Sequence, residues 1–157
     1  MSGVRDTDKG ASALAARLHR VAGSRVKVGV LQDAPKEAEE GSAGGDLSLL
    51  EVAALHEFGA PAANIPQRSF IRAGVDENLP EIQRVQHALA VQVFKGDVSL
   101  PVALDRLGAK VTALLQNRIS RGLTPPNADS TIAKKGSSKP LVDTGQLKAS
   151  ITWEVEA

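Results

Sequence analysis

Residues 25–31 carry the sequence RVKVGVL, and residues 151–156 carry ITWEVE. In both stretches apolar residues alternate with polar or small ones, a pattern typical of a strand with one buried face. The chain between them contains apolar residues at helical spacing, most clearly over residues 82–115. Strands near both ends with helices between them predict an α+β fold, in which three to four helices pack on a small, mainly antiparallel sheet.

Signals for helix starts and helix ends divide the rest of the chain. The expected helices are residues 11–22, 48–58, 78–95 and 99–121, followed by a short last helix around Leu147. Two of these helices open on predicted capping boxes, Ser48-Leu-Leu-Glu51 and Asn78-Leu-Pro-Glu81. In a capping box the first side chain and the fourth each bond to the other residue's backbone N–H, which fixes where the helix begins.

A chain of 157 residues fits one domain. We expect a loose polar tail at residues 1–10 and a single domain over residues 11–157. Two polar stretches, residues 32–47 and 123–140, are predicted to be long mobile loops because neither can bury enough apolar area to hold itself. Residues 60–74 are predicted to be a shorter loop with an extended piece at Ser69-Phe-Ile71.

Composition argues against several classes of function. The net charge is +1, from 19 basic and 18 acidic residues, so no overall field attracts nucleic acid or a membrane surface. The chain has no cysteine, which excludes thiol catalysis and cysteine zinc sites. No apolar run is long enough for a transmembrane helix, and the polar N-terminus does not resemble a signal peptide.

Motifs for catalysis and for cofactor binding are weak. His56-Glu57 resembles the first half of the zinc motif H-E-x-x-H, but Ala60 stands where the second histidine is required. The glycine-rich stretches at residues 41–45 and 136–139 do not match a phosphate-binding loop. We therefore predict that the protein is not an enzyme and that it uses no metal or other cofactor.

The two predicted long loops carry opposite charge. Residues 33–46 have a net charge of −4, and residues 118–140 have +4. The basic segment is open to three interpretations: solvated surface, contact with an acidic protein surface, or contact with nucleic acid. Under the second, the candidate intersubunit charges are Glu37, Glu39, Glu40, Lys134, Lys135 and Lys139.

Two segments contain motifs that neither charge nor catalytic or cofactor-binding patterns explain. The first is ALHEFG at residues 54–59, followed by NIPQRSFIR at 64–72 and DEN at 76–78; the second is PLVDTGQLKASI at 140–151. Together they resemble the tail-completion or neck proteins of long-tailed bacteriophages, the broad group that includes virion-morphogenesis proteins of Mu-like and lambda-like phages. In that group [E/Q]-[F/Y]-G leads into [I/M]-P-x-R-[P/S]-F-[L/I]-R, and L-x-D-T-G-x-L-x-x-S-I precedes the last strand.

The resemblance implies a non-enzymatic virion protein of the neck or top of the tail, assembled in the host cytoplasm. Such proteins form rings with themselves, usually of sixfold symmetry, around the path of the DNA. The implied partners are neighbouring head-completion or connector proteins and tail-tube or terminator proteins, with no membrane. Tail terminators and head-completion proteins share this place, so both stay as alternatives. The alternative from another class is a nucleic-acid-binding accessory protein that uses residues 118–140.

Two roles are open for the motif residues: stabilising the fold of the monomer, or contacting a neighbouring subunit. We expect Pro66 and Phe70 to fix a loop, and Arg68 and Arg72 to project to one side toward a partner's carboxylates. In the second motif, Asp143 is expected to cap the last helix, with Gly145 allowing a tight approach and Leu147 and Ile151 anchoring the segment. The candidate interaction and scaffold residues are Pro66, Arg68, Phe70, Arg72, Asp143, Thr144, Gly145 and Leu147.

The sequence departs from the pattern of this group at two places. Ser69 stands where many relatives have a proline before the phenylalanine. The acidic stretch at residues 32–47 is an insertion to which the resemblance assigns no role.

Overall fold

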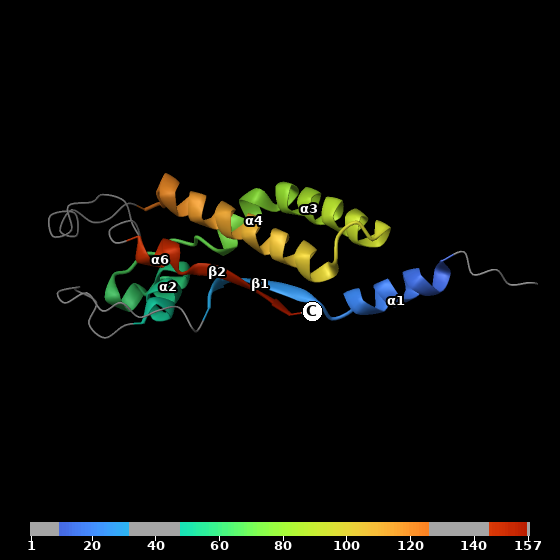
Figure 1. Cartoon of the computed structure of the whole chain (residues 1–157). Coiled ribbons are helices and arrows are strands. Elements are labelled where there is room, and N and C mark those ends of the chain that lie inside the picture. Colours follow the sequence, from blue (N-terminus) through green and yellow to red (C-terminus); the bar gives the residue numbers. More distant parts are fainter. Residues whose placement is uncertain (1–9, 32–47, 126–144, 157) are drawn as a thin grey trace, which may run out of the picture.

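The computed structural model describes residues 10–31, 48–125 and 145–156 (Figure 1). The elements in chain order are α1 (Ala11–Val21), β1 (Arg25–Val30), α2 (Leu49–Phe58), the 3₁₀ helix η1 (Pro61–Ala63), α3 (Arg72–Lys95), α4 (Leu100–Arg121), α6 (Gln146–Ala149) and β2 (Ile151–Glu156). This arrangement confirms the α+β prediction. The predicted tail and the two predicted long loops, apart from Gly10 and residues 123–125, lie outside the described residues.

The sheet consists of two antiparallel strands from opposite ends of the chain. Val30 pairs with Ile151, and Val28 pairs with Trp153. Because directly opposed residues share a face, the alternating apolar residues of both strands form one apolar face, on which α4 packs. On the other face, the side chains of Arg25 and Lys27 both form ion pairs with Glu156.

Helix α4 is the central layer of the body. Figure 1 shows α4 between α3 on one side and the β1–β2 sheet on the other. Its buried positions include Val111, Leu115 and Ile119, which recur every four residues and so line one side of the helix. The signals at both ends of α4 are as the sequence predicts, since Ser99 is the N-cap and Gly122 the C-cap. The apolar stripe of α4 therefore supplies much of the core.

Gly108 marks the closest approach of α4 to the sheet. A Cβ atom at this position would lie 2.4 Å from Cδ1 of Trp153, which no real contact allows. The indole of Trp153 in turn donates a hydrogen bond from Nε1 to Oδ1 of Asp105, at 2.9 Å. The absence of a side chain at position 108 is thus what lets the tryptophan ring lie against the helix.

We expect Gly108→Ala to destabilise the protein by about 1–3 kcal/mol, because the new methyl group overpacks the contact with Trp153. Helix propensity alone would have the opposite sign, since alanine stabilises a helix interior by roughly 1 kcal/mol relative to glycine. Ala113→Gly, at an exposed position of the same helix, measures that propensity term separately. Urea unfolding of both variants checks the prediction, and a more stable Gly108→Ala protein would contradict it.

The structure corrects the predicted start of α3. The sequence predicts a loop to residue 74 and a capping box at Asn78-Leu-Pro-Glu81, but the helix begins at Arg72 and contains Pro80 in its interior. Asn78 does not cap; its side-chain amide donates to the carbonyl oxygen of Gly74, one turn earlier. Residues 69–71 form no strand. The physical reason for the early start is a carboxylate supplied by α2, described below.

Candidate interaction site

Glu57, in the last turn of α2, binds the beginning of α3. Its carboxylate accepts backbone hydrogen bonds from Phe70 (2.8 Å), Ile71 (2.9 Å) and Arg72 (3.0 Å). It also accepts a bond from the hydroxyl of Ser69 at 2.7 Å. The side chain is buried, with the residue only 7% exposed. The carboxylate of Glu57, in the ALHEFG segment, therefore binds the backbone of residues 70–72 in the NIPQRSFIR segment.

These bonds explain why α3 begins where it does. The first N–H groups of a helix have no partner within the helix, and a negative charge near them is favourable because of the helix dipole. Glu57 supplies both the acceptors and the charge. Ser69 adds a further cap, because its hydroxyl oxygen accepts from the N–H of Ala73 at 3.2 Å. The serine that departs from the phage pattern thus has a structural role that a proline could not fill.

The electrostatics of Glu57 are set by two opposing effects. Burial removes water from the carboxylate and raises its pKa, while the hydrogen bonds from Ile71, Ser69, Arg72 and Phe70 favour the charged form and lower it. The hydrogen bonds prevail, and the pKa of Glu57 lies below its ordinary value. Glu57 is therefore charged at neutral pH and stabilises the native state in that form.

The loop between α2 and α3 is closed by short-range contacts. Ala60 and Ile65 form an isolated antiparallel bridge, and the N–H of Arg68 donates to the carbonyl oxygen of His56 at 2.7 Å. Gly59, at the turn, has a φ of 74°, in the region that favours glycine. A Cβ atom at Gly59 would lie 2.8 Å from the backbone nitrogen of Gln67. The glycine of the E-F-G motif is therefore required both by its backbone angle and by the close approach of residue 67.

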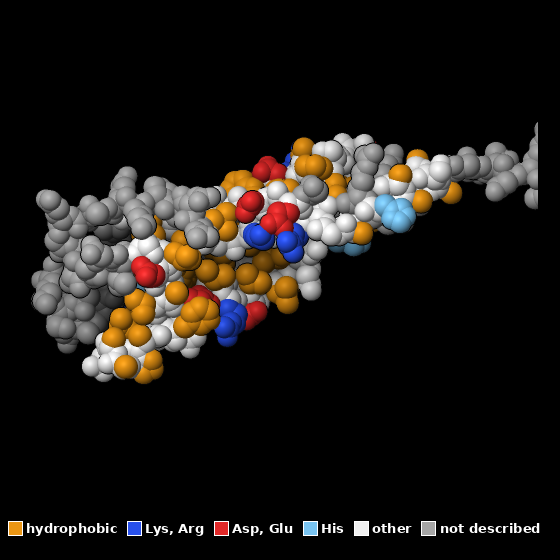
Figure 2. All heavy atoms as spheres, turned by 90° about the horizontal axis from the view of Figure 1, so that it is seen from below, with side chains coloured by type: hydrophobic (Ala, Val, Ile, Leu, Met, Phe, Trp, Pro, Cys, Tyr) orange, Lys and Arg blue, Asp and Glu red, His pale blue; other side chains and the backbone are white. Residues whose placement is uncertain are grey.

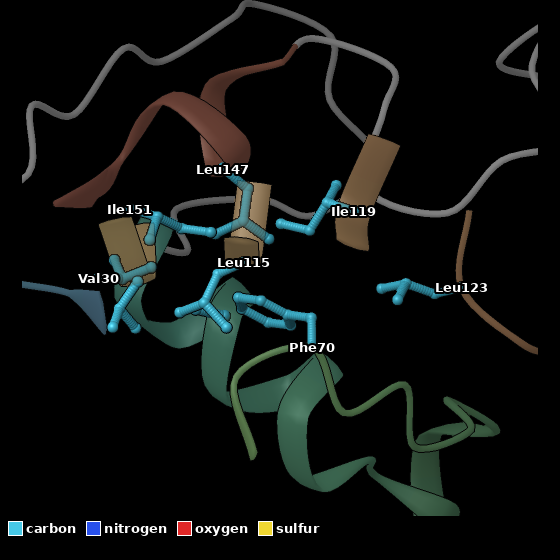
Figure 3. Packing of buried hydrophobic residues seen from close by; sticks show 9 residues of the cluster. Val30, Phe70, Leu115, Ile119, Leu123, Leu147 and Ile151 are labelled. Carbon is cyan, nitrogen blue, oxygen red and sulfur yellow. The ribbon is translucent and has the colours of Figure 1, made fainter. Parts of the chain in front are cut away.

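Phe70 joins the two sequence motifs in one core. Its side chain is 0% exposed and belongs to a cluster that includes Leu115, Leu147 and Ile151. Figure 3 shows the Phe70 ring beside Leu115, below Leu147 and Ile151. Residues 64–72 and 145–151 are far apart in the sequence, yet they pack against the same buried side chains of α4. The prediction that Phe70 and Leu147 are buried anchors agrees with this packing.

The two motif arginines differ in their surroundings. The sequence predicts that Arg68 and Arg72 project together toward a partner, and for Arg68 this is wrong. Arg68 is 7% exposed, and its Nε donates to the carbonyl oxygen of Pro125 at 2.8 Å. Burial lowers the pKa of Arg68. Arg72 and Pro66 are exposed, as are Asn64 and Gln67 of the same segment, so a partner can reach them.

The second motif is described only from Gly145 onward. Gly145 is the N-cap residue of α6, with a φ of 67°, so the cap position predicted for Asp143 belongs to the glycine. Asp143 and Thr144 lie outside the described residues. The six candidate intersubunit charges also lie outside them: Glu37, Glu39, Glu40, Lys134, Lys135 and Lys139. The predicted pairing of these charges stays a prediction.

The remaining observations on the described residues concern metal ligands, a surface hollow and membrane-spanning helices. Over residues 10–31, 48–125 and 145–156, no three His, Asp or Glu side chains gather in a way that could hold a metal ion. A hollow lies between the first half of α3 and the end of α4, lined by residues that include Glu77, Asn117 and Arg118. Arg118 there forms an ion pair with Glu77. Within the same part of the chain, no helix has the length and apolar character needed to cross a membrane.

Comparison of the chain with models of protein families, with curated protein sequences and with solved structures finds no match.

Proposed function

We propose that this chain is a structural virion protein of a long-tailed bacteriophage, a tail-completion or neck component that forms a ring at the head–tail junction. The observation that supports this most is the meeting of the two phage-like motifs in one core around Phe70. A resemblance carried by two separate motifs gains weight when their residues contact each other, because they then form one structural unit.

The contacts within the motifs also favour a scaffold over an enzyme. Glu57, the one strongly buried carboxylate of the first motif, has its oxygens occupied by four donors from residues 69–72. An acid or base for catalysis needs a free position toward a substrate. Glu57 instead fixes the loop that presents the exposed residues Pro66 and Arg72. The proposed partners are further copies of the chain and the adjoining connector, tube or terminator proteins.

The position of the gene and the content of purified particles test this function. We expect the gene to lie between those for the major capsid protein and the tail-tube protein. Mass spectrometry of purified particles of the encoding phage should find the protein at a few copies per particle. A gene remote from virion genes, together with strong salt-dependent binding of the purified protein to duplex DNA, would favour the nucleic-acid-binding alternative instead.

A further inference from the structure

The β1–β2 sheet has an outer edge on each side. It consists of two strands, so each strand pairs with another along one side only. Among the described residues, the backbone groups of both strands bond to nothing outside the sheet, except that the carbonyl oxygen of Ile151 accepts from Nε2 of Gln116. Backbone N–H and C=O groups along the edge of a sheet are a template for a further strand. Both edges can therefore accept one.

The accessible part of these edges lies at the end of the sheet away from the core. Val30 and Ile151 are buried, whereas every residue of 25–28 and of 153–156 is exposed or half-buried, apart from its place in the ladder. We call residues 25–28 the open edge of β1 and residues 153–156 the open edge of β2. Neither contains a proline, one of the devices that protect an edge. Figure 1 shows α1 leaving beyond the ends of the strands, so it does not run alongside either edge.

The two open edges carry opposite charge on the same face of the sheet. The open edge of β1 contributes Arg25 and Lys27, and that of β2 contributes Glu154 and Glu156. Within one chain both cations bind Glu156. The exposed Glu154 takes part in no ion pair among the described residues. Figure 2 shows basic and acidic side chains side by side near the middle of the molecule, in the view from below. One cation of β1 and one carboxylate of β2 are thus left to attract a neighbour.

Charge favours one of the three ways in which two copies can join these edges. Two β1 edges would bring Arg25 and Lys27 close to the same cations. Two β2 edges would bring Glu154 and Glu156 close to the same carboxylates, and like charges on neighbouring strands destabilise a sheet. The edge of β1 beside the edge of β2 instead places Lys27 opposite Glu154, in the register that the chain already uses within its own sheet.

The layers of the body leave room for this arrangement. Neighbouring strands lie about 4.8 Å apart, so two strands span roughly 10 Å. In each copy α4 is the helix that covers the sheet, and α3 lies on the far side of α4 (Figure 1). A helix with its side chains is about 10 Å across, and packed helices lie about 8–10 Å apart. Copies joined strand to strand would therefore bring their α4 helices to an ordinary packing distance.

We propose that the open edge of β1 in one copy pairs antiparallel with the open edge of β2 in a second copy, so that one sheet continues through successive copies. The two edges differ, so the contact is heterologous and repeats as a closed ring or an open filament. Backbone hydrogen bonds supply the affinity, and the charges select the edge. The proposal rests on the self-assembly in the proposed function but not on the virion setting, so purified protein tests it without any phage component.

A charge-swapped chain gives the sharpest test. It carries Arg25→Glu, Lys27→Glu, Glu154→Lys and Glu156→Lys, which retains the pairing within its own sheet and leaves the net charge unchanged. At low ionic strength we expect this chain to associate with itself as the wild type does. It should not associate with the wild type, because each edge would then meet its own sign. Native mass spectrometry of an equal mixture, with one protein isotopically labelled, should find severalfold fewer mixed oligomers than random exchange gives.

Glu81→Lys combined with Lys110→Glu is the matched control. It reverses a partly exposed ion pair between α3 and α4, away from the open edges, so this chain should mix freely with the wild type. Three results with the first charge-swapped chain would overturn the proposal. Preferred mixed oligomers would indicate that like edges pair, random mixing would indicate another contact surface, and a wild type that stays monomeric at every concentration would exclude the contact whatever the outcome of the virion tests.

Amide hydrogen exchange locates the contact independently. Along an antiparallel strand, the N–H of every second residue points away from the paired strand. Alternate amides of residues 25–28 and 153–156 should therefore exchange rapidly in dilute protein and severalfold more slowly once copies associate. Protection of one strand alone would indicate a symmetric contact, and protection already complete in the monomer would show an edge paired within the chain. Either result would contradict the proposal.

Discussion

Phe70→Ala is expected to destabilise the protein by about 3–5 kcal/mol, the usual effect of removing a fully buried aromatic ring. The ring is 0% exposed and contacts the cluster that unites the two motifs, so its loss leaves a cavity between α4 and the segment around Leu147. In the proposed assembly, the same change should prevent formation of functional particles. Urea unfolding of the purified variant and complementation of a phage that lacks the protein are the two measurements.

Phe94→Ala is the matched control for this prediction. Phe94 is 40% exposed near the end of α3, so its truncation should change the free energy of unfolding by less than about 1 kcal/mol. If the two alanine variants unfold at the same urea concentration, Phe70 is not the anchor of the NIPQRSFIR motif.

Glu57→Gln is expected to destabilise the protein by about 2–4 kcal/mol at neutral pH, although it only replaces one carboxylate oxygen with an NH₂ group. The carboxylate accepts bonds from four donors, whereas an amide offers one acceptor oxygen and turns an NH₂ group toward backbone N–H groups. Buried donors left without an acceptor cost about 1–3 kcal/mol each. Glu77→Gln is the control, because the side chain of Glu77 is 60% exposed and its ion pair with Arg118 contributes at most about 1 kcal/mol.

The pH dependence of the stability difference between wild type and Glu57→Gln gives an independent check. The pKa of Glu57 is lowered in the folded protein, so its stabilising effect is fully present above the unfolded value of about 4.3. The effect is lost as the pH falls through the lower, folded pKa. The gap in stability between wild type and Glu57→Gln should therefore be constant above about pH 5 and narrow below pH 4. A gap that does not change on acidification would show that the charge of Glu57 is not what holds α3.

The elements predicted correctly from the sequence depend either on contacts between near neighbours or on a simple periodic pattern. The Ser48–Glu51 capping box is formed as expected, with Glu51 N–H donating to Ser48 Oγ at 3.3 Å and the carboxylate returning a bond to Ser48. Gly96 and Gly122 end their helices as predicted. The alternating strands at both ends also pair with their apolar residues on one face. In each case the deciding interaction spans a few residues or follows a simple period.

The incorrect predictions involve partners that are distant along the chain. Asn78-Leu-Pro-Glu81 has the local pattern of a helix start, but Glu57 provides a stronger cap at Arg72 from fifteen residues away. Arginine is usually exposed, so the sequence favours a surface position for Arg68. Its hydrogen bond to Pro125 depends on where the chain runs after α4 ends, which no local pattern indicates. One signal was present in the sequence: Glu57 lies within the motif, at a position where the phage pattern has glutamate or glutamine, and both side chains carry an oxygen that can accept backbone hydrogen bonds.

The most direct test of the neck function is electron microscopy of particles made by the encoding phage when this gene is deleted. We expect heads filled with DNA and separate tails of normal length that fail to join, with joining restored by wild-type protein supplied in trans. Complete, infectious particles in the absence of the protein, or a failure to make tails at all, would contradict a role in completing the head–tail junction.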